Sequence, residues 1–236
     1  MEAGALLIQL RRSIGGRVDS DVLRARGDID SHHHIVDALA RLRPDDAVLS
    51  EEGVDDPRRL DSSRVWIVDP LDGTREFGEL HRDDWAVHVA LWRDGDLDAG
   101  AVAMPARDAV FSTADPPPPP VHDGGRLRIA VSRIRPPRVA RAIAVALDAE
   151  LVPMGSAGAK AMAVVSGDVD VYAHAGGQYE WDSAAPVAVA RSAGVHASRI
   201  DGAPLHYNRE GAWLPDLLIC RPDLRDRVLA LVAGSR

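Results

Sequence analysis

The chain has 236 residues, of which 46% are hydrophobic and 27% charged, as is ordinary for a globular protein. Its net charge of −8 argues against a broad nucleic-acid-binding face, which needs an excess of basic residues. The charge does not exclude a small anionic substrate, because bound cations can invert the local field. The single cysteine, Cys220, excludes an internal disulfide and a thiolate metal site. No apolar run reaches the length of a membrane span and residues 1–12 lack signal-peptide features, so we expect a cytoplasmic protein without membrane contact.

The first half of the sequence predicts two helices followed by strands. Residues 3–12 have helical character. The second helix is expected to be capped by Asp28 or Asp30 and to end before Pro44. Short apolar runs predict four strands: 47–50, 64–69, 85–92 and 100–104. The second of these strands is expected to stop at Pro70, because proline cannot donate a sheet hydrogen bond.

A run of prolines, residues 116–120, divides the sequence. It cannot lie inside a helix or a central strand and predicts a stiff extended connector, with a proline-rich partner-binding motif as the alternative. We therefore place a domain boundary there, with 1–120 as an α+β half that holds most of the candidate metal ligands and 121–236 as an α/β half. The second half alternates between strands and helices. Its predicted strands are 127–131, 151–154, 169–173 and 217–220, and its predicted helices are 139–147, 156–165, 183–192 and 225–232.

An Asp-Gly turn at the end of a buried strand carries the strongest chemical signal. Asp69 ends the strand and Asp72 follows in the turn, so their carboxylates converge with the Leu71 carbonyl between them. Gly73 permits a positive φ and a close backbone approach, and the amides near Gly73 and Thr74 then open toward an anion. An ordinary Asp-Gly turn is the alternative. Two carboxylates beside an anion make sense only if cations lie between them.

Two further acidic residues complete an all-oxygen ligand set. Glu51 begins a glutamate pair after a short apolar run, and Asp182 precedes an Ala-rich helix. Taken singly, the glutamate pair is typical of a solvated loop and Asp182 of a helix N-cap. The candidate ligands are the carboxylates of Glu51, Asp69, Asp72 and Asp182 and the carbonyl of Leu71. Such hard ligands favour about two or three Mg²⁺ ions, with Mn²⁺ as the alternative.

Residues 65–74 and 181–185, together with 50–52, resemble the signature motifs of the inositol monophosphatase superfamily, in the order of that family. The resemblance covers nearly the whole chain. It implies a layered αβαβα sandwich of the α/β class with the active site between its two halves, a Mg²⁺-dependent phosphatase activity and inhibition by lithium. It also implies that Glu51 is the metal ligand of its pair and that Asp28 bonds Thr74. The family's first helix begins earlier, so we expect this chain to be shortened at its start.

Three shorter stretches, 82–88, 155–162 and 174–178, are similar to the CysQ-type 3'(2'),5'-bisphosphate nucleotidases within this superfamily. Members of that branch remove the 3'-phosphate from adenosine 3',5'-bisphosphate, a by-product of sulfate activation and sulfotransfer. The resemblance therefore implies a phosphoric monoester hydrolase of sulfur metabolism that acts on a small phosphorylated metabolite. A phosphatase for inositol 1-phosphate or fructose 1,6-bisphosphate is an alternative with the same metal site, and a non-catalytic nucleotide sensor is another. The oligomeric state is left open, a homodimer included.

Each candidate site residue has an expected role in hydrolysis. Glu51 and Thr74, the latter oriented by Asp28, take the proton of a water that a metal ion activates. Substrate selection is expected to fall to the second half, where Ser156 caps a helix that carries Lys160 near the ribose or the second phosphate. A capped helix with a surface lysine is the alternative. The expected substrate contacts are Asp72, Gly73, Thr74, Ser132, Arg133, Gly155, Ser156, Lys160, His174, Glu180 and Asp182.

Overall fold

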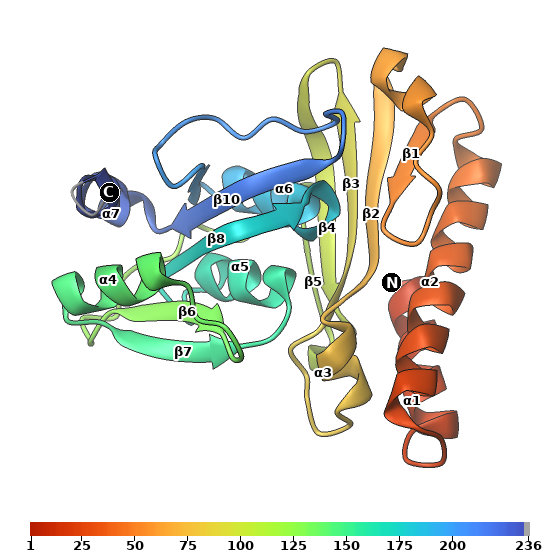
Figure 1. The fold of residues 1–236 in the computed structure, drawn as a ribbon, viewed down its shortest axis with the longest axis horizontal. Helices are drawn as coiled ribbons and strands as arrows, with labels where there is room; N and C mark the ends of the chain where they lie inside the picture. Colours follow the sequence, from red (N-terminus) through yellow and green to blue (C-terminus); the bar gives the residue numbers. More distant parts are fainter. Residues whose placement is uncertain (234–236) are drawn as a thin grey trace.

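The computed structural model describes residues 1–233, which form two five-stranded sheets (Figure 1). The strands of the first sheet are β1 (Ala47–Ser50), β2 (Arg64–Asp72), β3 (Ala86–Arg93), β4 (Asp96–Met104) and β5 (Ala109–Ser112). They follow one another in sequence order across the sheet. β1 is parallel to β2, whereas the other neighbours are antiparallel. The parallel pair β1–β2 is the part of this sheet that leads to the site described below.

The second sheet has the order β7-β6-β8-β10-β9. Its strands are β6 (Arg128–Ser132), β7 (Glu150–Met154), β8 (Val171–Tyr179), β9 (His196–Ser198) and β10 (Trp213–Cys220). β6 is parallel to both β7 and β8, whereas β10 is antiparallel to β8 and β9. The mixed sheet agrees with the alternation of strands and helices in the second half of the sequence.

Helices and sheets alternate in five layers (Figure 1). The helices are α1 (Glu2–Ile14), α2 (Ser20–Leu42), α3 (Thr74–Gly78), α4 (Arg138–Leu147), α5 (Ala157–Val165), α6 (Ala184–Ser192) and α7 (Arg225–Ala233). α1 and α2 cover the outer face of the first sheet, α5 and α6 lie between the sheets, and α4 and α7 cover the outer face of the second. This arrangement confirms the layered αβαβα sandwich. No helix within residues 1–233 is both long and apolar enough to span a bilayer.

The two sheets share one hydrophobic core around α5 and α6. Ile67 of β2, Val187 of α6 and Ile219 of β10 belong to the same buried cluster. α6 packs so closely on β4 that a Cβ added to Gly100 would lie 2.7 Å from the Cβ of Ala188. Small side chains on both elements therefore set the distance between them, and the two halves share this cluster, although each also has a buried cluster of its own. The division of the chain at the proline run stays a prediction.

Helix α2 begins well before Asp28 and Asp30, so the cap expected at those residues was wrong. The cap is Asp19, whose side chain accepts a hydrogen bond of 2.8 Å from the N–H of Asp21. The buried stripe of the helix consists of Leu23, Gly27, Ser31, Ile35 and Leu39. Because glycine and serine give no apolar signal at the centre of this stripe, its first part looks polar in the sequence.

The strand predictions also need correction, and β4 and β10 each begin four residues earlier than predicted. β2 continues past Pro70 to Asp72, because its pairing with β3 is irregular between Asp69 and Asp72 and needs no N–H from the proline. β8 extends beyond the predicted end at residue 173 to Tyr179. β5 and β9 were not predicted; they are edge strands of four and three residues, too short to give a periodic signal.

Candidate active site

Glu51 and Asp69 lie side by side because two parallel strands end together. Ser50 of β1 pairs with Val68 of β2, and the Glu51 N–H donates to the Val68 carbonyl at 3.2 Å. The next residue along each strand therefore places a carboxylate at the same edge of the sheet. The carboxyl ends of parallel strands are where α/β sheets commonly bind ligands.

The turn after Asp69 is held by hydrogen bonds to its own backbone. Asp69 Oδ1 accepts from the Leu71 N–H at 3.1 Å, and Ser31 of α2 donates to the Pro70 carbonyl at 2.7 Å. Gly73 has a φ of +85°, which disfavours a side chain, and a Cβ there would lie 3.3 Å from the backbone of the loop before β3. The turn therefore has little freedom to move its carboxylates.

Thr74 contacts two acceptors at the start of α3. Its Oγ1 lies 3.1 Å from Asp28 Oδ1 and 3.0 Å from the Leu71 carbonyl. Since a hydroxyl carries one proton, it can donate to only one of them at a time. Burial raises the pKa of Asp28 to about 6, against the lowering effect of the Thr74 hydrogen bond and together with a raising effect of Glu52. The hydrogen bond that the family resemblance implies is present.

Asp182 is positioned by a short turn of 3-10 helix, Glu180–Asp182, that precedes α6. Its Oδ2 accepts a hydrogen bond of 2.7 Å from the Tyr179 N–H at the end of β8. The carbonyl of the preceding residue, Trp181, accepts from His88 Nδ1 on β3 at 3.2 Å. The segment is therefore tied to both sheets, which brings Asp182 toward the carboxylates of the first half.

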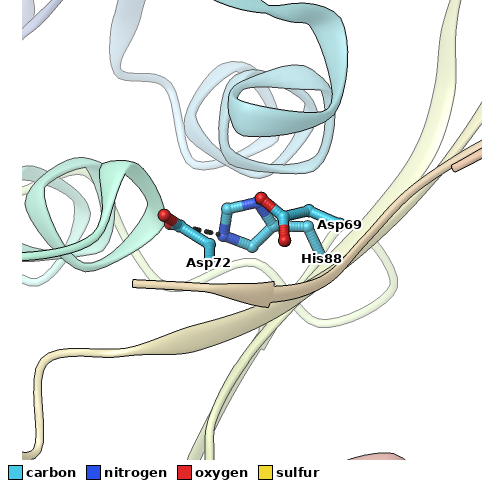
Figure 2. A group of neighbouring side chains, drawn as sticks. All are labelled: Asp69, Asp72 and His88. Carbon is cyan, nitrogen blue, oxygen red and sulfur yellow. Dashed lines mark ion pairs between the residues drawn. The ribbon is translucent and has the colours of Figure 1, made fainter. Parts of the chain in front are cut away.

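Asp72 is held by the start of α5 in the second half of the chain. Its carboxylate accepts hydrogen bonds from Ser156 Oγ at 2.5 Å, from the Ala157 N–H at 3.0 Å and from the Gly158 N–H at 2.6 Å. His88 Nε2 lies 3.2 Å from Asp72 Oδ2, as the dashed line in Figure 2 marks. Asp72 thereby joins the two halves of the molecule at the site.

The carboxylates of the site raise one another's affinity for protons. Burial raises the pKa of Asp69 well above its ordinary value, and Asp72 and Glu51 raise it further. Loss of solvent raises the pKa of Glu51 to about 7 and that of Asp182 to about 6, and a neighbouring carboxylate adds to each rise. Burial acts in the same direction on Asp72, but His88 and the contacts at α5 lower its pKa to about 2. The negative charges of the cluster are thus not balanced by nearby positive charges.

His88 is a site residue that sequence reasoning missed. It is completely buried, and its Nδ1 lies 3.9 Å from Asp69 Oδ2, so the ring stands between two carboxylates (Figure 2). Burial acts to lower its pKa, but Asp72 outweighs that effect and the pKa is raised. The ligand atoms of Asp69, Asp72 and His88 all lie within 4.8 Å of one another. A lone histidine inside an apolar strand was the available signal, since buried polar groups need partners.

Two adjoining cavities, with volumes of about 350 Å³ and about 170 Å³, share Ser132, Ser156 and Lys160, and the larger one is also lined by Asp72. Of the expected substrate contacts, the larger cavity is lined by Asp72, Ser132, Ser156, Lys160, His174 and Asp182. The smaller cavity is lined by Ser132, Arg133, Gly155, Ser156 and Lys160. The structure therefore brings most of these residues together, although they are far apart in the sequence.

Lys160 is buried between these cavities. Its Nζ donates to the carbonyls of Gly155 and Ser156 and lies 5.3 Å from the centre of the Tyr172 ring. Burial lowers its pKa, and the nearby carboxylates, Asp72 foremost, counteract only part of that effect. No carboxylate within residues 1–233 forms a direct ion pair with it, and Lys160 lines both cavities.

Arg133 and Glu180 have other partners. Arg133 lines the smaller cavity but also pairs with Glu76 at 2.6 Å and Glu79 at 3.1 Å, which ties the second half to α3. Glu180 is completely buried and accepts the N–H groups of Asn208 at 2.6 Å and of the next residue at 2.8 Å. Of the expected substrate contacts in the second half, Glu180 is the one that the structure does not bring to either cavity.

Residues 8–232 match the sequence pattern described as the Inositol monophosphatase family. The match covers nearly the whole chain and agrees with the layered fold and the acidic cluster at the ends of β1 and β2. The chain therefore belongs to the inositol monophosphatase family, and the resemblance seen in its motifs is confirmed.

Individual relatives point to one branch of this family. A Mycobacterium bovis protein named 3'-phosphoadenosine 5'-phosphate phosphatase is 51% identical over 247 residues, covering 99% of this chain and 90% of that protein. An Escherichia coli K12 protein named 3'(2'),5'-bisphosphate nucleotidase CysQ is 36% identical over 202 residues, covering 79% and 80% of the two chains. The crystal structure of CysQ from Bacteroides thetaiotaomicron covers 93% of both chains with a TM-score of 0.79 at 24% identity, which shows the shared fold.

Proposed function

We propose that this chain is a Mg²⁺-dependent 3'(2'),5'-bisphosphate nucleotidase that removes the 3'-phosphate of adenosine 3',5'-bisphosphate. The observation that carries the proposal is the Thr74 hydroxyl, hydrogen-bonded to Asp28 and set beside the carboxylate cluster. A protein that only bound a phosphate would gain nothing from a hydroxyl and a carboxylate paired in this way. The names of the Mycobacterium bovis and Escherichia coli relatives support the choice of substrate.

The residues present fit a metal centre of hard cations. Glu51, Asp69, Asp72, Asp182 and the Leu71 carbonyl would hold the ions. The raised pKa values of three of these carboxylates reflect burial and mutual repulsion, which cations would relieve. All the ligands are oxygens, so we propose about two or three Mg²⁺ ions, with Mn²⁺ as the alternative. When bound, such ions lower the pKa of water and neutralise negative charge on the phosphate.

The side chains of the site move the proton of the attacking water. Thr74 Oγ1 accepts a proton from the water as it passes its own to Asp28 Oδ1, 3.1 Å away. The pKa of Asp28, raised to about 6, makes its carboxylate a better acceptor than an ordinary aspartate. Glu51, directly after the end of β1 and beside Asp69, is the second acceptor. The amides of Gly73 and Thr74 bind the oxygens of the phosphate as its charge redistributes.

The second half of the chain selects the substrate. The larger cavity, which reaches Asp72 and Asp182, takes the ribose between Ser132, Ser156 and His174. The smaller cavity is lined by Lys160, Arg133 and Arg75, and it takes the second phosphate. Two phosphates on one ribose thus meet two groups of cations: the metals at one and basic side chains at the other.

The test compares kcat/KM for adenosine 3',5'-bisphosphate, inositol 1-phosphate and fructose 1,6-bisphosphate at saturating Mg²⁺. We expect the nucleotide to be preferred over inositol 1-phosphate by at least about tenfold, since a site with a cation for a second phosphate favours it by about 1.4 kcal/mol or more. Phosphorus NMR should identify adenosine 5'-monophosphate as the product. A preference for either of the other esters would contradict the proposed substrate and assign that ester in its place. Nucleotide binding without phosphate release would contradict the proposed enzymatic activity and indicate a nucleotide sensor.

A further inference from the structure

The larger cavity beside the carboxylates has aromatic walls. It is lined by Tyr179 and Trp213 as well as by Asp72 and Asp182. Its volume of about 350 Å³ lies within the range of about 300–1,000 Å³ that small-molecule sites occupy. Tyr179 is 46% exposed and Trp213 50% exposed, and both line the cavity, so both offer surface to a ligand. Only 4% of the chain is aromatic, which makes two exposed rings at one cavity unusual.

The end of the second sheet holds these rings in place. Trp213, the first residue of β10, pairs across the strands with Tyr179, the last residue of β8. Their ring centroids are 5.1 Å apart and their planes are inclined by 82°. Tyr179 also stacks on Trp181, with centroids 4.5 Å apart and planes inclined by 9°. Aromatic pairs of this geometry attract one another, so the rings are positioned before a ligand arrives.

Gly177 sets the position of the indole. A Cβ on Gly177 would lie 1.8 Å from Trp213 Cζ2, so the indole packs directly against the backbone at residue 177. Gly177 also has a φ of +90°, which favours glycine for a second reason. One part of the indole is thus fixed on the sheet, while Trp213 as a residue remains 50% exposed. Such a flat, fixed surface binds a planar ring with little loss of side-chain freedom.

We propose that Trp213, held by Gly177 and Tyr179, is the platform on which the nucleobase of the substrate stacks. The proposal rests on the function proposed above and extends it from the two phosphates to the base. Every base has an aromatic face that stacks on such rings, whereas inositol and fructose have none. Because Tyr179 and Asp182 are joined by a hydrogen bond, the platform is adjacent to a candidate metal ligand. Trp213 is then a specificity-determining residue that touches the base and not the reacting phosphate.

The experiment measures inhibition constants for adenosine 5'-monophosphate and for ribose 5-phosphate, which lacks the base, on wild-type and Trp213→Ala proteins. The assay substrate is whichever phosphate ester the wild type hydrolyses. We expect the constant for adenosine 5'-monophosphate to rise about tenfold and that for ribose 5-phosphate to change less than about twofold. With adenosine 3',5'-bisphosphate, KM should rise and kcat should stay nearly constant. Trp213→Phe keeps an aromatic ring, so its inhibition constant for adenosine 5'-monophosphate should stay close to that of the wild type.

The outcomes separate this proposal from the function on which it rests. An equal rise in the inhibition constants of both inhibitors, or no rise in either, would overturn the platform and leave Trp213 as a structural partner of Tyr179. If the wild type does not hydrolyse the bisphosphate, the proposed function fails, and the ratio of the two inhibition constants still decides the platform. Trp92→Phe, on β3 and outside the cavity, is the matched control and should leave both constants unchanged.

Discussion

Asp72 belongs to the first sheet by sequence but is held by the second half of the chain. Three hydrogen bonds reach it from Ser156, Ala157 and Gly158 at the start of α5. Negative charge at a helix N-terminus is stabilised by the unpaired amides there. Burial acts to raise the pKa of this carboxylate, but His88, Lys160 and the Ser156 hydroxyl lower it. The ligand geometry at Asp72 therefore depends on how closely α5 approaches the first sheet.

Replacing Lys160 by alanine should reduce kcat/KM for adenosine 3',5'-bisphosphate by roughly tenfold or more. The metal ions neutralise the phosphate that is cleaved, so the second phosphate needs a cation of its own. A charge-assisted hydrogen bond contributes about 1.5–3 kcal/mol, and about 1.4 kcal/mol corresponds to tenfold. Inositol 1-phosphate has no second phosphate, so kcat/KM for this substrate should fall little. Steady-state phosphate release with both substrates measures the difference.

Lys160→Met is the matched control, because it keeps the apolar stem and removes the charge. It should lose the bisphosphate activity as the alanine variant does. Urea unfolding of both variants measures the separate cost of losing the hydrogen bonds to the carbonyls of Gly155 and Ser156. Equal losses with both substrates would assign Lys160 to structure or to the shared catalytic site, and would remove the main support for a second phosphate.

The start of α5 can approach β3 because residue 158 has no side chain. A Cβ on Gly158 would lie 2.0 Å from His88 Nε2. We therefore expect Gly158→Ala to lower the free energy of unfolding by about 1–3 kcal/mol through overpacking. At an unobstructed helical position the same change would stabilise by about 0.4–1 kcal/mol, so the sign of the effect tests the contact. Urea denaturation measures it.

The double variant Gly158→Ala/His88→Ala is the control for this contact. Removing the imidazole opens space for the new methyl group, so the two changes together should cost less than the sum of the single costs. A Gly158→Ala protein as stable as the wild type, or more stable, would contradict the close approach of α5 to β3.

The carboxylate of Asp84, in the loop before β3, binds the backbone at the start of α5. Its Oδ2 accepts from the Gly155 N–H at 2.6 Å, and its carboxylate pairs with Arg82. Burial acts to raise its pKa, but Arg82 and the Gly155 N–H outweigh that effect and lower it. A lowered folded-state pKa means that the contribution to stability is present above the unfolded-state value, about 3.9, and is lost as the pH falls through the folded-state value.

Asp84→Asn should therefore lower the free energy of unfolding by about 1.5–3 kcal/mol at neutral pH, and by less as the pH falls below about 4. Urea unfolding across this pH range measures the difference from the wild type. Asp83→Asn is the matched control: Asp83 is exposed and pairs with Arg107 at 3.1 Å, so its loss should cost no more than about 0.5 kcal/mol. A pH-independent cost at Asp84 would show that its charge does not stabilise the junction.

The site exists only where both sheets and the helices between them meet. Glu51 and Asp69 come from the strand ends of the first sheet, Asp182 from the turn before α6, and α5 holds Asp72. The helices α5 and α6 also carry the core that both sheets share. Packing of the two halves and assembly of the carboxylates are therefore the same event.

The acidic motifs could be predicted because each lies in a short, dense stretch of sequence where strand ends and turn residues act locally. The layered fold was expected from the resemblance of these motifs to the inositol monophosphatase superfamily, and it was confirmed. His88 and the pair of Tyr179 and Trp213 could not be predicted, since their partners lie on other strands and only the register of the sheets brings them together. The start of α2 was missed for a related reason: Gly27 is buried by contact with Phe77 and carries no apolar signal itself.

The measurement that tests the account most directly is phosphate release from adenosine 3',5'-bisphosphate as Mg²⁺ is added back to chelator-treated protein. The wild type should be inactive without the cation and recover activity with it, because the carboxylates need positive charge to bind a phosphate. Asp72→Asn should stay inactive at saturating Mg²⁺, while circular dichroism shows an intact fold. Activity of the wild type without any divalent cation, or near-normal activity of Asp72→Asn at saturating Mg²⁺, would contradict the metal site.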